Sequence, residues 1–174
     1  MKNLIVTFLM ACMGLYASAQ DNFTQFESME GVQFLDIKPR MFKLLSKIDL
    51  NPDDPEMKEY MDMVDDLEGI KLYTTEVSNT AGLMESAVTK YLSGAGLEEL
   101  MRAKSDEANV KFYIKPGKSD DFVRELLMFV DSLDGGKRAV IIKITGNIDL
   151  RKVSKIANSL SFPGAEELKK AETK

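Results

Sequence analysis

Apolar and polar residues alternate along several short stretches of the chain, and this pattern predicts β-strands. In the most apolar stretch, Val140, Ile142 and Ile144 fall on one face, and β-branched residues dominate, as a half-buried strand requires. We expect Gly146 and Asn147 to turn the chain after this strand. The same alternation predicts further strands over 32–37, 70–77 and 110–115.

Apolar residues spaced three or four positions apart predict helices between these strands. From Thr80 to Leu92, pairs of apolar residues repeat every four positions and form one continuous stripe. Asp149 can cap a last helix over 149–160, in which Val153 and Ile156 belong to such a stripe. Shorter stripes predict helices over 39–48 and 55–68 and a helical turn over 97–101.

The segment from Phe122 to Val130 fits either a helix or a strand. A helix would take Ser119 or Asp120 as its cap, whereas a strand would be a buried run paired on both sides. We favour the strand because the short connections on both sides suit hairpins. The predicted order is therefore β-α-α-β-α-β-β-β-α, an α+β fold in which helices pack on one face of a mainly antiparallel sheet.

The first residues have the pattern of a secretory signal peptide. Lys2 precedes a short apolar run, and small residues lead to the expected cleavage between Ala19 and Gln20. In the alternative, the chain is an outer-membrane lipoprotein whose lipidated residue is Cys12. We expect three parts, namely a signal peptide over 1–19, a single α+β domain over 20–163 and a mobile charged tail over 164–174.

Several segments of the chain share a pattern with one known family. The strand that runs into Met41–Leu45, the pair Leu72–Tyr73, the segment Arg124–Met128 and, above all, Ile144–Leu150 resemble the Bacteroidota family catalogued as domain of unknown function 4252. The resemblance covers nearly the whole chain after the signal peptide. It implies a Gram-negative envelope setting, which means the periplasm, the outer-membrane surface or secretion. Because the family has no established activity, the resemblance assigns no functional residues.

The composition excludes most of the common catalytic centres. The chain has no histidine and no tryptophan, and its one cysteine, Cys12, lies within the predicted signal peptide. A Ser-His-Asp triad, a cysteine nucleophile and a zinc site of histidine and thiolate are therefore excluded from the mature protein. We assign no catalytic, cofactor-binding or metal-binding residue and expect no cofactor.

Carboxylates are the reactive groups that remain. Asp53, Asp54 and Glu56, with Asp62, Asp65 and Asp66 nearby, carry the hard oxygen ligands that calcium prefers. The same residues fit a structural role, because Asp54 can cap a helix and Glu56 suits the positive end of its dipole. Any two of the 28 acidic residues could form a glycosidase-like pair, but no spacing in the sequence selects one.

One group of residues is a candidate for a binding face. Lys111, Tyr113 and Lys115 share a strand face and could bind an acidic group, although an exposed sheet face commonly has this composition. The formal net charge of −5 disfavours nucleic acid as a partner, and no later apolar run is long enough to span a membrane.

We therefore expect an exported, non-enzymatic binding or interaction module of the cell envelope. Its partner would be an envelope protein or a surface component, and the mature protein would lie in the periplasm or be secreted. The alternatives are a carboxylate-dependent hydrolase, a calcium-assisted binder of envelope polymers, and an envelope stress or signalling accessory.

Overall fold

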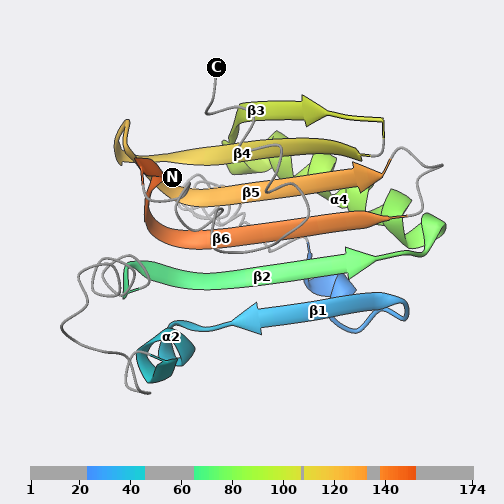
Figure 1. Cartoon of the computed structure of the whole chain (residues 1–174), viewed down its shortest axis with the longest axis horizontal. Helices are drawn as coiled ribbons and strands as arrows, with labels where there is room; N and C mark the ends of the chain where they lie inside the picture. Colours follow the sequence, from blue (N-terminus) through green and yellow to red (C-terminus); the bar gives the residue numbers. More distant parts are fainter. Residues whose placement is uncertain (1–22, 46–64, 107, 133–137, 152–174) are drawn as a thin grey trace, which may run out of the picture.

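The computed structural model describes residues 23–45, 65–106, 108–132 and 138–151 (Figure 1). Within these ranges six strands form one sheet, and every neighbouring pair is antiparallel. The strands are β1 (Val32–Ile37), β2 (Leu67–Thr75), β3 (Glu98–Lys104), β4 (Ala108–Ser119), β5 (Phe122–Ser132) and β6 (Ala139–Asp149). The helical elements are the 3-10 turn η2 (Thr24–Phe26) and the α-helices α2 (Pro39–Leu45) and α4 (Ser78–Ala95).

The last strand of the sheet, β6, lies in its middle. The strand order is β1-β2-β6-β5-β4-β3, and Figure 1 shows β6 between β2 and β5. Strands β3, β4 and β5 each pair with the next strand along the chain, as hairpins do. The pairing of β2 with β6 instead joins segments that are far apart in sequence. This long-range pairing therefore connects the two halves of the sheet.

Helix α4 and the turn η2 pack on one face of the sheet, which we call the α4 face. Tyr73 of β2 and Ile141 of β6 are fully buried there, in one apolar cluster with Met84 of α4 and Phe26 of η2. The rings of Phe26 and Tyr73 meet edge to face with their centroids 6.4 Å apart. Figure 1 shows α4 crossing behind the strands.

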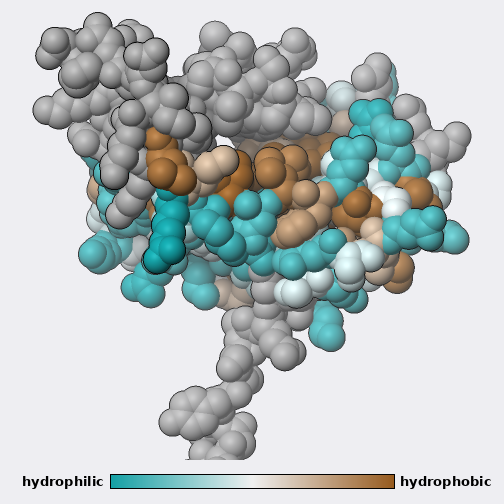
Figure 2. Space-filling view, turned by 90° about the horizontal axis from the view of Figure 1, so that it is seen from below, coloured by the Kyte–Doolittle hydropathy of each residue, from teal (hydrophilic) through white to brown (hydrophobic). Residues whose placement is uncertain are grey.

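The opposite face of the sheet is also apolar. Phe112, Met128 and Val140, from three different strands, are no more than 4% exposed. Because successive strand residues point to opposite faces, a strand that is buried on both faces becomes continuously apolar, as β5 is from Leu126 to Val130. Figure 2, seen from the side of β1, shows hydrophobic residues gathered along the sheet beside a hydrophilic rim.

The expected fold class is wrong in its balance of helix and strand. Most of the described chain is strand, and the expected set of helices packed over one face is not what the described ranges contain. Four of the five residues of the helical turn predicted over 97–101 are instead the start of β3. A β-bulge between Glu99 and Met101 shifts the alternation, so that Met101 packs on the sheet while Leu100 is 53% exposed. This irregular spacing resembled a helical period.

Two local predictions are confirmed. The segment from Phe122 onward is a strand, β5, rather than a helix. Asp149 acts as the expected cap, because its carboxylate accepts the backbone N–H of Arg151 at 3.0 Å. The rest of the helix expected over 149–160 lies outside the described residues, as do most of the helix expected over 55–68, the predicted signal peptide and the predicted tail.

Gly146 lies inside β6, so the turn expected at Gly146 and Asn147 is wrong. Its φ of 141° belongs to a region that side chains other than glycine rarely adopt. The residue pairs with Leu67, where the register between β2 and β6 shifts. A Cβ atom at this position would lie 2.4 Å from the carbonyl oxygen of Asp66. Glycine therefore allows β2 and β6 to approach closely at the bulge.

We predict that Gly146→Ala lowers the free energy of unfolding by about 2–4 kcal/mol, because the new Cβ clashes with backbone and the required φ is strained. The control is Gly82→Ala on the exposed side of α4, where an added Cβ would meet no atom within 4 Å. That change should raise stability by about 0.5–1 kcal/mol through helix propensity. Urea unfolding of both variants measures the difference, and equal effects would contradict this account of Gly146.

Candidate functional site

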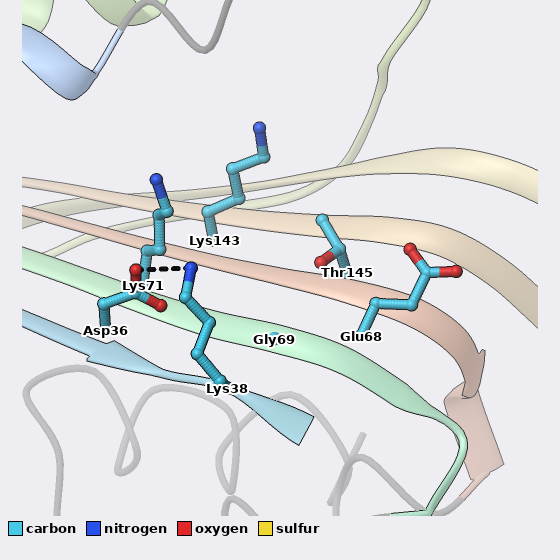
Figure 3. Close-up of a pocket in the computed structure, with 7 residues that line it drawn as sticks. All are labelled: Asp36, Lys38, Glu68, Gly69, Lys71, Lys143 and Thr145. Atoms are coloured by element: carbon cyan, nitrogen blue, oxygen red, sulfur yellow. Dashed lines mark ion pairs between the residues drawn. The ribbon is translucent and has the colours of Figure 1, made fainter. Parts of the chain in front are cut away.

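A polar hollow of about 120 Å³ lies on the α4 face, where β1, β2 and β6 run side by side (Figure 3). We call it the polar hollow. Two residues further along their strands, Tyr73 and Ile141 belong to the buried core. The same sheet face therefore changes from apolar core to polar surface within one pleat repeat. The residues that line the hollow are Asp36, Lys38, Glu68, Gly69, Lys71, Lys143 and Thr145.

Two lysines face each other in this hollow. Lys71 of β2 and Lys143 of β6 are direct partners in the antiparallel register, and Figure 3 shows both side chains on the same side of the sheet. Residues directly opposite each other on one face have Cβ atoms about 4.5–5.5 Å apart, and like charges there are destabilising. The fold therefore concentrates positive charge at a point where it costs free energy.

Neighbouring elements compensate for part of this repulsion. The Lys71 Nζ atom lies 3.0 Å from a carboxylate oxygen of Glu27, the residue that follows η2. The Lys143 Nζ atom lies 4.6 Å from the ring centroid of Tyr91 on α4, within the range of a cation–π interaction. Both compensating groups come from elements that are anchored in the core of the α4 face.

Tyr91 also binds a buried carboxylate. Its hydroxyl group is 2.8 Å and 2.9 Å from the two carboxylate oxygens of Glu125 on β5, and only 7% of Glu125 is exposed. A buried carboxylate is costly unless it accepts hydrogen bonds. This contact therefore fixes the position of the Tyr91 ring over Lys143.

The acidic side chains of the hollow are separated from each other. Asp36 forms an ion pair of 2.6 Å with Lys38, and Figure 3 shows Glu68 at the other end of the hollow. This separation does not bring two carboxylates together as an acid and base pair would require.

No metal site is found in the part of the chain that the structure describes, since no three acidic side chains gather there closely enough to hold an ion. The calcium candidates Asp53, Asp54 and Glu56 lie outside the described residues. Among those same described residues, no helix is long and apolar enough to cross a membrane.

The predicted binding-face residues lie on the same sheet face but do not line the hollow. Tyr113 is only 9% exposed and belongs to the core, so it is not available as a surface ring. The Lys111 Nζ atom lies 5.8 Å from the Phe129 ring centroid, and Lys115 is half-buried opposite Glu125 in the register. Their role in binding stays a prediction. Ala19, Gln20 and Cys12, the predicted processing residues, lie outside the described ranges.

Sequence reasoning missed the hollow because its residues come from three strands. Lys71 and Lys143 are each a charged residue within an otherwise apolar strand, on the face where Tyr73 and Ile141 are buried. These two charged positions were the available signal for a site. Their meeting depends on the register between β2 and β6, which no local pattern contains.

In comparisons with known proteins, the chain matches the model of one protein family. The model of the family described as domain of unknown function (DUF4252) matches residues 26–156. No curated protein and no solved structure matches the chain.

We predict that Tyr91→Phe lowers the free energy of unfolding by about 1–3 kcal/mol, because it removes the O–H that donates to the buried Glu125 carboxylate. The loss should be smaller in a Glu125→Gln background, as a double-mutant cycle would show. Thr89→Ala, which removes an exposed hydroxyl from the same helix, is the control and should change stability by less than about 0.5 kcal/mol. A Tyr91→Phe loss that is independent of Glu125 would contradict the proposed contact.

Burial raises the pKa of the Tyr113 hydroxyl above its ordinary value; the Glu99 carboxylate adds to this effect, and Arg102 opposes it. A raised pKa means that the folded state favours the neutral phenol. Its stabilisation is complete below the unfolded pKa of about 10 and is lost as the pH rises through the folded pKa.

We therefore predict that the wild-type protein loses more stability between pH 8 and pH 11 than the Tyr113→Phe variant does. Denaturant unfolding at both pH values measures the two losses. Equal losses of stability in the two proteins would mean that the Tyr113 hydroxyl does not contribute to the pH dependence.

Proposed function

Because the chain belongs to the family of domain of unknown function 4252, a description that assigns no activity, we propose its function from the polar hollow. We propose that the protein is an exported, non-enzymatic binding module of a Bacteroidota cell envelope. In this proposal, the hollow binds an anionic group of an envelope component through Lys71 and Lys143.

The pattern at the N-terminus supports export. Lys2, the apolar run after it and the small residues that end at Ala19 have the order of a secretory signal. The chain that cleavage after Ala19 would leave has no cysteine, so it would carry neither a disulfide nor a free thiol in an oxidising compartment. The mass of the N-terminus of the natively exported protein tests this part and separates cleavage before Gln20 from a lipid on Cys12.

The lysine pair carries the binding proposal. Two ammonium groups held opposite each other repel, and an anion that bridges them replaces this repulsion with two charge-assisted hydrogen bonds. The Thr145 hydroxyl lines the same hollow and can donate a further hydrogen bond. Lys38 forms an ion pair with Asp36, a carboxylate that lines the hollow, so that the site repels an incoming anion less.

The chemistry of the chain supports binding rather than turnover. It has no histidine, its cysteine precedes the predicted cleavage site, and Asp36 and Glu68 are separated across the hollow. A hydrolase would need a positioned acid and base or nucleophile within reach of one reacting bond.

The test compares two double variants that remove the same charge. Lys71→Ala with Lys143→Ala should weaken the binding of methyl phosphate at least about tenfold, since each charge-assisted hydrogen bond contributes about 1.5–3 kcal/mol. Lys90→Ala with Lys104→Ala removes two exposed lysines from α4 and β3 and should change the affinity less than about twofold. Titrations followed by amide chemical shifts measure both affinities.

Two results would contradict the proposal. In one, the wild-type protein does not bind methyl phosphate. In the other, both double variants lose affinity equally, so that only the net charge matters. Unfolding curves of each variant confirm that the comparison is made on folded protein.

A further inference from the structure

The Glu27 carboxylate forms an ion pair with Lys71, one of the two cations that the proposed ligand would contact. One of its oxygens lies 3.0 Å from the Lys71 Nζ atom and 3.5 Å from the Tyr73 hydroxyl oxygen. The side chains of Glu27 and Lys71 are 30% and 22% exposed, so the ion pair sits at the rim of the hollow and is open to solvent.

The backbone holds Glu27 in this position. It directly follows η2, and its N–H donates to the carbonyl of Thr24. Phe23, which precedes this turn, and Phe26, its last residue, are fully buried. The centroid of the Phe23 ring lies 5.1 Å from that of the Tyr91 ring. The turn is therefore anchored, while the Glu27 side chain beyond its Cβ can rotate away from Lys71.

The Glu27 carboxylate already neutralises the Lys71 ammonium, so an anion that approaches Lys71 either displaces this carboxylate or is repelled by it. A singly charged anion would exchange one negative charge for another at Lys71, so the attraction gained there nearly equals the attraction lost. A doubly charged anion makes the same exchange and brings a second negative charge to Lys143, which is the direct partner of Lys71 in the register. The exchange is therefore favourable chiefly for an anion with two charges on one group.

We propose that Glu27 is a specificity-determining residue that makes the polar hollow select doubly charged anions, such as a phosphate monoester, over singly charged ones. This inference rests on the proposed function, because it concerns the ligand class of the same site. It adds that a carboxylate of the protein itself sets the charge that a ligand must carry.

A matched pair of ligands isolates the charge. Methyl phosphate is doubly charged at pH 8, because the second pKa of a phosphate monoester is about 6, whereas dimethyl phosphate carries one charge on nearly the same group. The wild-type protein should bind methyl phosphate at least about tenfold more tightly.

Glu27→Gln should strengthen the binding of both ligands and should strengthen that of dimethyl phosphate more. The gain should be about two- to fivefold, the range expected for a solvent-exposed ion pair. The ratio of the two affinities should therefore fall. Glu30→Gln removes one exposed carboxylate from the same segment and should keep the wild-type ratio. Glu27→Ala is a second variant that should repeat the Glu27→Gln result.

The outcomes separate this inference from the proposed function. If methyl phosphate binds and depends on Lys71 and Lys143, but the Glu27 variants keep the wild-type ratio, the specificity role of Glu27 is overturned and the binding function stands. If neither ligand binds the wild-type protein, both are overturned.

Two further binding experiments, the two arms of this test, distinguish a soluble phosphate ester from a lipid headgroup as the natural ligand. Glycerol 3-phosphate represents a soluble ester, and phosphatidylcholine vesicles with and without phosphatidic acid represent a lipid headgroup. Tighter binding by Glu27→Gln than by the wild-type protein in either arm supports the inference and identifies the source. No gain in either arm overturns it.

Discussion

The pairing of β2 with β6 is the constraint on which the rest of the structure depends. It joins two segments far apart in the chain and places β6 in the middle of the sheet. A slip of one residue in this register would move every side chain of β6 to the other face. The two apolar faces, the close approach at Gly146 and the meeting of Lys71 with Lys143 all require the same register.

The polar hollow is a consequence of how the α4 face is covered. Core side chains such as Tyr73 and Ile141 lie beside α4 and η2, and the polar residues follow along the same strands. The two covering elements each contribute one group to the lysine pair, Glu27 from the segment after η2 and the Tyr91 ring from α4. The charge balance of the site is thus set by elements that the hydrophobic core holds in place.

The strands were largely predictable from the sequence because burial on one or both faces imposes a period of two or a continuous apolar run. The alternation in β4 correctly placed Lys111, Tyr113 and Lys115 on one face, but it did not reveal that Tyr113 is buried there. The errors occurred at irregular positions. The bulge between Glu99 and Met101 gave the start of β3 an apolar spacing typical of a helical turn. Gly146 was predicted as a turn residue, although it is a glycine required inside a strand.

The site was not predictable in the same way, because it depends on pairing rather than on pattern. Each lysine alone is an ordinary polar residue in a strand, and only the register makes the two of them neighbours. The most direct test of the central claim is cross-linking with a short reagent that joins two amines, followed by mass spectrometry of the peptides. We expect a link between Lys71 and Lys143 that methyl phosphate suppresses. The lack of this link, or a link that the anion does not affect, would contradict the central claim.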